Sequence, residues 1–371
     1  MSKARELASL GNAYSDGSLS NRNKLINGAM VIDQRNGGAA VTPAGSSYTL
    51  DRWRLGASAA SKVSVQQSSV APEGFSNSAL ITSVSAYTMG AIEEINFGQR
   101  IEGYNASDLG WGTASAKAVT LSFWVRSSLT GLFSGAVKNA DGTRSYAFTY
   151  SISTANTWEY KSVTIQGDTS GTWSATNSTG VVAQFMIAAG SSLLTTANAW
   201  ASGNYAGATG ATNLVATNGA TIYLTGVQLE VGDTATPFEH RSYGQELALC
   251  QRYYWNNFGS QPASTVKAGN SPDNRCTIAT LYNGVELQCA PISFNNTMRT
   301  SPSIIYYKPA HISTSGRWGV YGPTNGWGAG MPISGYHANQ NGVTVMLTSA
   351  SGVSDFQSFI VSGYLEADAE L

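Results

Sequence analysis

Short segments that alternate between apolar and polar residues fill the chain from Lys24 onward. Several are rich in β-branched or aromatic residues and are separated by Gly, Pro, Asn and Ser, as expected for strands: NGAMVID, YTLDRWRL, KVSVQQSSV, SALITSVSA and GAIEEINF. The strongest pattern is KAVTLSFWVRSS, which would place Val119, Leu121, Phe123 and Val125 on one face. Many such segments without a long helix predict an all-β protein whose first domain is a jelly-roll β-sandwich.

Changes in this pattern predict where the domains divide. Residues 1–24 combine two possible helical turns with a polar, turn-rich stretch and form a separate N-terminal segment, which is either a frayed terminus or an anchoring peptide. Residues 25–241 form the first domain, residues 242–256 a short linking helix, and residues 257–371 a second, C-terminal β-sandwich. The hairpin signal Asn283-Gly284 lies in this last region.

The junction VQLEVGDTATPFEHRSYGQELALCQRYYW is the densest run of charged and aromatic residues in the chain. Its first part continues a regularly alternating strand, Ile222–Val231, which closes the first domain. Ser242 followed by Gln245 is a capping-box pattern. Leu247, Cys250 and Tyr254 then follow at helical spacing, which predicts one apolar stripe that packs the domain junction or a trimer axis.

Composition narrows the classes of function. Charged residues are only 12% of the chain and the net charge is −1, with no block of either sign. This distribution argues against nucleic-acid binding, which needs a concentrated basic face. Forty glycines and many small polar residues fit a rigid β-protein or assembly subunit. Neither a secretory signal nor a run of ~20 apolar residues is present, so membrane insertion is not expected.

Motifs for catalysis or metal binding are sparse. The three cysteines, Cys250, Cys276 and Cys289, have no metal-ligand spacing and are expected as ordinary core thiols. His240, beside Glu239 and Arg241, is better explained by a local ion-pair and capping cluster than by catalysis.

Carboxylates offer little more. A glycosidase needs two acids across a cleft, whereas Glu93 and Glu94 would point to opposite faces of a strand, and Glu102 with Asp108 is the other near approach. No enzymatic activity and no cofactor are therefore expected. A structural calcium site is conceivable with carboxylates such as Glu94 and Asp233, or Asp51 and Glu230, although no DxDxDG loop supports it.

Aromatic side chains in glycine-rich stretches are candidates for sugar contact, because a pyranose face stacks on Trp or Tyr. Trp111, Trp173, Trp200 and Tyr205 lie in such stretches of the first domain. In the second domain, GRWGVYGPTNGWGAGMPISGY is expected to form loops that carry Trp318, Tyr321, Trp327 and Tyr336. These residues contact a receptor, or they wedge between trimer subunits and fix a long loop.

Four linked motifs resemble a group of bacteriophage tail-fibre and related virion proteins. They are LINGAMVIDQRNGG followed by YTLDRWRL, then the junction quoted above, FNNTMRTSPSI, and the closing YLEADAEL. The resemblance covers residues from about 24 to 371 in the same order.

This resemblance implies a homotrimeric structural protein of the virion tail that is assembled in the host cytoplasm. Its first domain would be similar to carbohydrate-binding modules. Residues 1–24 would attach to a tail, adaptor or baseplate protein, and the distal second domain would contact a host surface glycan or lipopolysaccharide. Two alternatives remain open: a non-adhesive structural component of the tail or neck, and, less favoured, a surface-polysaccharide depolymerase.

Overall fold

The computed structural model describes residues 21–259, 276–282, 286–308, 317–322, 326–327, 331–348 and 358–371, together with Lys3. The predicted attachment segment 1–24 thus lies outside the described residues apart from Lys3 and residues 21–24. The chain forms two compact units. The first runs up to Val31 and from Ala40 to Ser242, with Leu371; the second combines Ile32–Ala39 with Tyr243–Glu370. A short loop near the start of the chain therefore belongs to the second unit.

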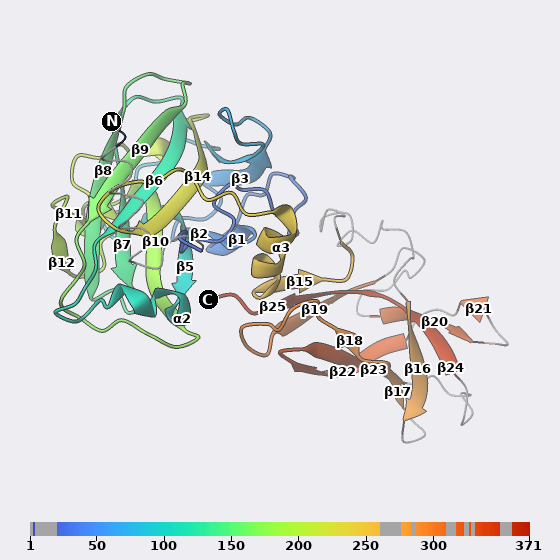
Figure 1. Ribbon diagram of the computed structural model, residues 1–371. Helices are drawn as coiled ribbons and strands as arrows, with labels where there is room; N and C mark the ends of the chain where they lie inside the picture. The colour runs from blue at the N-terminus through green and yellow to red at the C-terminus, as the bar shows by residue number, and fades with distance from the viewer. Residues whose placement is uncertain are drawn as a thin grey trace. The chain divides into compact units, whose positions relative to one another are not determined.

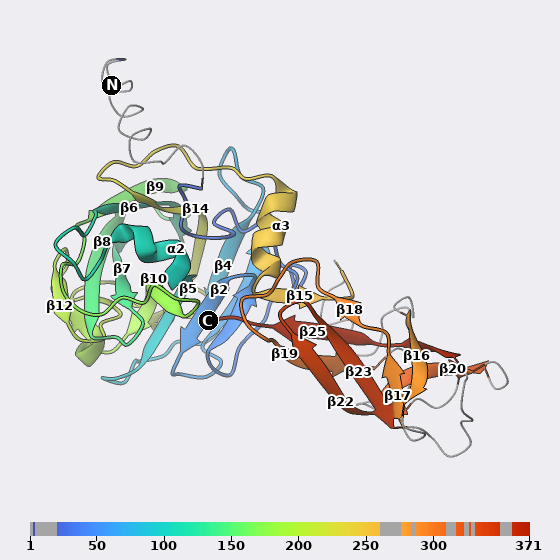
Figure 2. The ribbon, with the colours of Figure 1, turned by 60° about the horizontal axis from the view of Figure 1, so that its bottom comes forward.

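The first unit is a sandwich of two antiparallel sheets (Figures 1 and 2). The seven-stranded sheet has the order β1 (Ser47–Leu50), β2 (Trp53–Ala57), β5 (Glu94–Glu102), β10 (Thr179–Ala189), β7 (Gly131–Asn139), β8 (Arg144–Ile152), β12 (Trp200–Ser202). The five-stranded sheet has the order β3 (Val63–Ser68), β4 (Ser78–Ser83), β14 (Thr221–Val231), β6 (Val119–Ser127), β9 (Glu159–Ile165). Between them lies one apolar core to which both sheets contribute alternate residues.

Short elements fill the connections of the first unit: α2 (Gly103–Ala106), the 3₁₀ turns η1 (Ser107–Leu109), η2 (Ser191–Leu193) and η3 (Leu214–Ala216), and the parallel pair β11 (Leu194–Thr195) and β13 (Gly207–Ala208). The prediction of an all-β fold is confirmed. In the described part of the chain, no helix is long and apolar enough to cross a membrane.

Strand β6 confirms the strongest sequence pattern. Its residues Val119, Leu121, Phe123 and Val125 are all buried at 1% exposure or less and face the core. Local alternation was sufficient here because β6 is central in its sheet and has no irregularity in its pairing with β9.

Strand β14 departs from the regular alternation that its sequence predicts. Its pairing with β6 shifts register between Thr225 and Gln228, which is a β-bulge. Gly226 lies there at φ +59°, in the left-handed region that glycine accepts. The bulge changes which positions face inward: Leu224 points into the core before it, and Val227 and Leu229 do so after it. The predicted single face from Ile222 to Glu230 is therefore wrong.

The segment NGAMVID is not the strand that its sequence predicts. Asn27 and Met30 have φ of +58° and +57°, which breaks any extended ladder. YTLDRWRL likewise forms two strands, β1 and β2, joined by a turn in which Arg52 has φ +68°. Trp53 begins β2 with its ring stacked on Phe97, and its Nε1 donates to Asn27 O. The residues after the first motif thus hold its turns in place.

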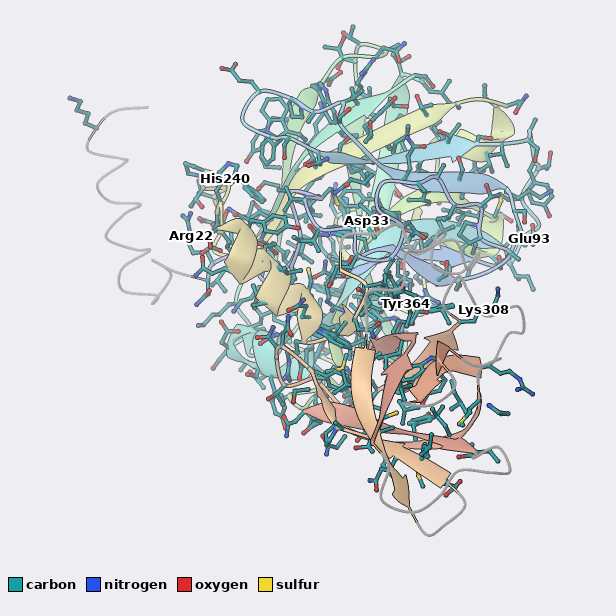
Figure 3. The ribbon with its side chains drawn as sticks, turned by 90° about the vertical axis from the view of Figure 1, so that its right-hand side faces the viewer. Arg22, Asp33, Glu93, His240, Lys308 and Tyr364 are labelled. Atoms are coloured by element: carbon teal, nitrogen blue, oxygen red, sulfur yellow. The ribbon has the colours of Figure 1, made fainter. Side chains whose placement is uncertain are left out.

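Residues 22–28 instead form a clasp with β14 and the segment after it. Asn23, which is 5% exposed, accepts hydrogen bonds from the Leu25 and Leu229 amides through Oδ1 and donates from Nδ2 to Val227 O. Gly28 and Val227 are joined by a backbone hydrogen bond, and a Cβ on Gly28 would lie 2.2 Å from Val227 O. Arg22 donates to Thr236 Oγ1 and Pro237 O, close to the segment that carries His240 (Figure 3).

The second unit contains a small sheet and a larger one. The three-stranded sheet has the order β15 (Tyr254–Asn256), β25 (Tyr364–Asp368), β19 (Ser303–Tyr307). The larger sheet has the order β17 (Glu286–Cys289), β16 (Cys276–Tyr282), β24 (Ser358–Ser362), β20 (Arg317–Gly322), β22 (Met331–Asn339), β23 (Gly342–Thr348), β18 (Ile292–Ser293), with β21 (Gly326–Trp327) paired to β20. Because β17 also pairs with β23, the larger sheet closes on itself. Its strands therefore face one another across the interior of the same sheet.

The hairpin predicted around Asn283-Gly284 is present as the β16–β17 pair, in which Tyr282 lies opposite Glu286. The turn residues themselves lie outside the described part. Cys250 and Cys289 are buried free thiols, as expected.

The linking helix is shorter than its apolar spacing predicts. Helix α3 (Tyr243–Gln251) contains Leu247 and Cys250, of which Cys250 is fully buried. Tyr254 lies beyond the helix in β15, where it pairs with Asp368 and its hydroxyl donates to Glu366 Oε2. The helical stripe of Leu247, Cys250 and Tyr254 is therefore not formed, because the chain turns into a strand after Gln251. A role for these residues at a trimer axis stays a prediction.

Candidate functional site

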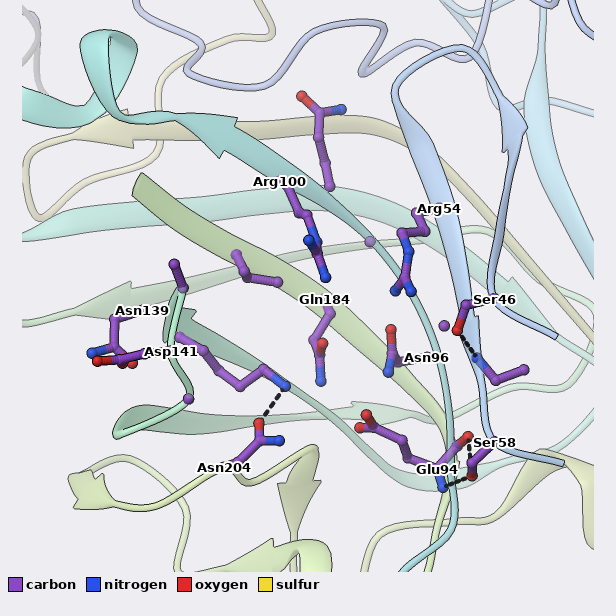
Figure 4. Close-up of a pocket in the computed structure, with 18 residues that line it drawn as sticks. Ser46, Arg54, Ser58, Glu94, Asn96, Arg100, Asn139, Asp141, Gln184 and Asn204 are labelled. Atoms are coloured by element: carbon purple, nitrogen blue, oxygen red, sulfur yellow. Dashed lines mark hydrogen bonds between the residues drawn. The ribbon is translucent and has the colours of Figure 1, made fainter. Parts of the chain in front are cut away.

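A groove of about 290 Å³ lies on the outer face of the seven-stranded sheet. Figure 4 shows its side chains rising from neighbouring strands. The lining is almost entirely polar or glycine and contains no aromatic residue: Ser46, Arg54, Gly56, Ala57, Ser58, Glu94, Asn96, Gly98, Gln99, Arg100, Lys138, Asn139, Ala140, Asp141, Gly142, Val182, Gln184 and Asn204. All these residues belong to the first unit.

The floor of the groove follows from strand alternation and register. On β5, Ile95 and Phe97 point into the core, so Asn96 and Gly98 face outward. Register places Arg54 opposite Gly98 and Gly98 opposite Gln184, which gives one row across three strands. Gly98 has no side chain, so the floor of the groove is open at the middle of this row. A larger residue would not fit there, because a Cβ would lie 2.3 Å from Ala183 O and 2.6 Å from Gln184 Cα.

Gln184 is the buried polar group at the centre of the floor. Its side chain is only 4% exposed, and its Nε2 has no hydrogen-bond partner among the described residues. An unpaired buried amide N–H costs ~1–3 kcal/mol. Buried polar groups in native proteins almost always have partners, so this N–H is a candidate donor to a water molecule or a ligand in the groove.

Lys138 enters the groove from β7 and is 7% exposed. Its Nζ donates to Asn204 Oδ1 at 2.9 Å. Burial lowers the pKa of Lys138; Glu94 opposes this effect, whereas Arg100 and Arg54 add to it. The ammonium is thus held at a cost, with one neutral amide oxygen as its hydrogen-bond acceptor.

Two arginines stand on the other side of Gln184. Arg54 on β2 and Arg100 on β5 point toward the groove centre in Figure 4. Burial lowers the pKa of Arg54, and the charge of Arg100 lowers it further. Within the part of the chain that the structure describes, neither guanidinium forms an ion pair or a hydrogen bond.

The acidic residues of the lining compensate these cations only in part. Asp141 is committed to a turn, where its Oδ1 accepts hydrogen bonds from the amide and hydroxyl of Thr143, and these bonds lower its pKa. Glu94 faces the same groove, and its charge favours protonated Lys138. Glu93 lies just before β5, so it is not the strand neighbour of Glu94 that the sequence predicts, and its carboxylate accepts from Tyr87 Oη and the Gly90 amide.

The lysine gives a pH prediction. Because the folded-state pKa of Lys138 lies below the ordinary 10.5, the unfolded chain binds more protons between these two values. The loss of folding stability caused by burying the charged Lys138 is fully present below the folded-state pKa of this lysine. It is relieved as pH rises toward 10.5. We expect Lys138→Met to be more stable than the parent at pH 7 and this advantage to shrink by pH 10. Urea unfolding of both proteins at the two pH values checks it; a constant difference would contradict the burial effect.

The aromatic residues predicted for receptor contact are not in loops. Trp318 and Tyr321 lie in β20, Trp327 in β21 and Tyr336 in β22. Trp318 is 1% exposed and belongs to the core of the second unit, where its ring contacts Tyr306, so the expected surface position is wrong for it. The glycine-rich sequence suggested loops, but glycine also occurs within strands, where it often marks a bulge or a bend.

Tyr336 is 42% exposed, and its ring lies 5.7 Å from that of Tyr306. The side chains of Tyr321 and Trp327 lie outside the described residues. Receptor contact by these three residues stays a prediction.

In the first unit, three of the loop tryptophans form one cluster. Trp111, Trp173 and Trp200 contact one another edge to face at 4.7–5.6 Å. Each indole N–H donates to a backbone carbonyl of the unit, so these rings fix loops. Arg144 covers Trp200 and is held by a bidentate ion pair with Asp168. Tyr205 lies apart from these rings, over Gly203.

The candidate calcium ligands are not brought together. Glu94 lies on the seven-stranded sheet and Asp233 follows β14 of the other sheet. The described residues contain no group of three or more His, Cys, Asp or Glu that could hold a metal. Asp108 pairs with Lys24 at 2.6 Å and not with Glu102.

His240 stands against the rings of Phe75 and Phe238, while Glu239 and Arg241 form the expected local ion pair. Arg241 also donates to Asn23 O, so this pair belongs to the clasp.

Sequence reasoning missed the groove residues Arg54, Arg100, Lys138 and Gln184. Their signal was present in the polar positions that alternate with core residues, as in WRLGA and EINFGQRIE. The order of the strands, which brings these positions together, was not available from the alternation.

No protein-family model matches this sequence, and no curated protein does. Among solved structures, the chain is similar to the enzymatically active domain of bacteriophage CBA120 tailspike protein 4, with 15% identity, a TM-score of 0.32, and coverage of 57% of this chain and 22% of that one. It is also similar to the module TmCBM61 in complex with β-1,4-galactotriose, with 11% identity, a TM-score of 0.29, and coverage of 57% and 100%. A third is the family 11 carbohydrate-binding module of the cellulosomal cellulase Lic26A-Cel5E of Clostridium thermocellum, with 15% identity, a TM-score of 0.26, and coverage of 51% and 96%. The chain thus spans about a fifth of the tailspike domain and nearly all of the two modules.

Proposed function

We propose that this protein binds a saccharide in the groove on the seven-stranded sheet and uses this contact for attachment to a cell surface. The observation that carries the proposal is the buried, unpaired Nε2 of Gln184 at the centre of a polar groove. A ligand that accepts its hydrogen bond would remove the cost of leaving it unpaired.

The chemistry of the lining favours a polyhydroxylated ligand. Asn96, Gln184 and Asn204 supply amides, which both donate and accept, and Ser46 supplies a hydroxyl. Sugar hydroxyl groups also donate and accept, so each can find a partner in such a lining. An apolar ligand would strand these groups, and the absence of aromatic residues from the lining means that recognition here would rest on hydrogen bonds.

We further propose the setting that the sequence motifs imply: a tail-fibre component of a phage virion, homotrimeric, attached by its first residues and contacting a host glycan or lipopolysaccharide. The support for this setting is the resemblance of four motifs in one order. The proposal includes no catalytic step. The proposal places the saccharide contact in the first unit, whereas the sequence predicts a contact in the second unit.

Gln184→Leu separates binding from folding. Removing an unpaired buried donor while keeping its volume should leave stability unchanged or slightly higher. We expect saccharide affinity to fall about tenfold, the usual worth of one well-placed hydrogen bond to a bound ligand. Isothermal titration of the full chain with saccharides first identified on an array of bacterial surface glycans measures the change.

Gln66→Leu is the matched control, because Gln66 lies on β3 of the other sheet and outside the groove. Equal binding by Gln184→Leu and the parent would remove the groove as the site. Lack of binding to every glycan on the array, with the parent chain folded, would favour the alternative of a non-adhesive structural component of the tail or neck.

A further inference from the structure

We infer that the groove is built for an acidic saccharide, whose carboxylate or phosphate group would lie between Arg54 and Arg100 above Gln184. The inference rests on the proposed saccharide binding and adds to it the chemical class of the sugar. It comes from the placement of the two guanidinium groups.

Register makes the two arginines close neighbours on one face. Arg54 on β2 lies opposite Gly98 of β5, and Arg100 is two residues further along β5. Such diagonal positions on adjacent antiparallel strands have Cα atoms ~7–8 Å apart, within reach of two long side chains. Figure 4 shows both guanidinium groups directed toward Gln184 rather than away from each other.

The placement is unfavourable without a ligand. Like charges on neighbouring strands destabilise a sheet. Burial and the charge of Arg100 both lower the pKa of Arg54, and Glu94 opposes them only in part. Arginines near a protein surface normally turn to water or pair with a carboxylate. Within the described residues neither of these two pairs with a carboxylate at salt-bridge distance, although each is half-buried.

The acids of the groove offset the charge of the pair only in part, since Glu94 raises the pKa of Arg54 less than burial and Arg100 lower it. Glu94 and Arg100 occupy outward positions of β5 six residues apart, which is ~20 Å along a strand at ~3.3 Å per residue. Glu94 is nearer in effect to Lys138, whose protonated form it favours. Asp141 is occupied by its turn. Arg54, Arg100 and Lys138 therefore share Glu94 as the carboxylate of the lining that is not committed to a turn, which leaves the groove with an excess of positive charge at the arginine pair.

Gln184 completes the anion site. It lies in the same row as Arg54, with Gly98 between them and no side chain in the way. An anionic group held by two guanidinium forks would also accept from Gln184 Nε2, which has no other partner in the described structure. The neutral amides Asn96 and Asn204 remain for the sugar hydroxyls. The ligand that uses every group is an anionic sugar unit within a glycan.

The test compares matched acidic and neutral probes with the full-length chain. Isothermal titration would use trigalacturonic acid as a carboxylate probe, galactose 6-phosphate as a phosphate probe, and galactotriose and galactose as their neutral counterparts. We expect at least one acidic probe to bind about tenfold or more tightly than its neutral counterpart, because charge-assisted hydrogen bonds are roughly twice as strong as neutral ones. The preference should shrink at high salt. The acidic probe that binds identifies carboxylate or phosphate as the recognised group.

Arg54→Gln and Arg100→Gln provide the residue-level test. Each relieves the repulsion, so neither should lower stability, and each should reduce the preference for the acidic probe about tenfold while changing the neutral probe little. Arg126→Gln is the control, since Arg126 lies on β6 of the other sheet against Tyr223. It should bind like the parent.

Two results would overturn the inference. One is neutral probes that bind as tightly as acidic ones, which leaves saccharide binding intact but removes the charge preference. The other is an acidic preference that survives both arginine substitutions. If no saccharide binds at all, the proposed function fails together with the inference.

Discussion

The Asn23→Ala variant is expected to lose about 3–5 kcal/mol of its free energy of unfolding, because three buried backbone groups lose a partner at ~1–3 kcal/mol each before relaxation. These groups are the amides of Leu25 and Leu229 and the carbonyl of Val227. The loss would come from one small side chain that joins the start of the first unit to its last strand. Urea unfolding followed by circular dichroism measures it.

Asn105→Ala is the matched control for this substitution. Asn105 is exposed in α2 and should change stability by less than ~0.5 kcal/mol, as surface positions usually do. Hydrogen exchange adds a local measurement, since the Leu229 amide should lose protection in Asn23→Ala. If the two variants unfold at the same urea concentration, the clasp does not hold the unit together.

The Gly98→Ala variant is expected to lose about 2–4 kcal/mol and to bind saccharide more weakly. Its Cβ would meet backbone atoms of β10, 2.3 Å from Ala183 O and 2.6 Å from Gln184 Cα, so β5 and β10 must move apart. Forced overpacking of this kind typically costs ~1–3 kcal/mol, and backbone neighbours cannot turn aside. Both strands carry groove residues, so affinity falls with stability.

Gly45→Ala controls for the glycine substitution itself. A Cβ at Gly45 has no neighbour within 4 Å, so this change should be neutral or slightly stabilising. Thermal unfolding and isothermal titration of both variants give the two quantities. A Gly98→Ala protein with parental stability and affinity would show that the floor of the groove tolerates a side chain.

The regular strands could be predicted from sequence because their evidence is local. β6 and the β16–β17 hairpin follow alternation and turn chemistry within one short stretch of sequence each. The β14 bulge could not be predicted in this way, because TIYLTGVQLEV alternates on either side of Gly226 and only the pairing with β6 reveals the extra residue. The prediction of a strand at NGAMVID failed for a related reason. Its apolar residues are buried by turns with positive φ and not by pairing in a β-sheet.

The motifs that carry the family resemblance turn out to be structural. Gly28 of the first motif and Asn23, two residues before that motif, hold β14, and Arg241 of the junction donates to Asn23 O. In the second unit, Arg35 of the same first motif pairs with Asp368 and Glu370 of the last motif and covers the Tyr254 ring at 3.9 Å. Arg299 of the third motif donates to Ala369 O. The motifs thus bind one another.

The groove could not be predicted from the sequence because the order of the strands in the sheet was not known. Arg54, Arg100, Lys138 and Gln184 come from four strands whose order in the sheet, β2-β5-β10-β7, differs from their order in the chain. Each polar position could be assigned to an outward face, but its neighbours could not. Aromatic residues drew attention because stacking is a familiar mode of sugar binding, whereas Trp318 is needed in the core of the second unit.

A crystal structure of the chain soaked with the tightest-binding surface oligosaccharide tests the central claim most directly. The account predicts a sugar unit on the outer face of the seven-stranded sheet, with one of its oxygens within hydrogen-bond distance of Gln184 Nε2 and an acidic group between Arg54 and Arg100. A sugar bound to the second unit, with the groove free, would contradict the account.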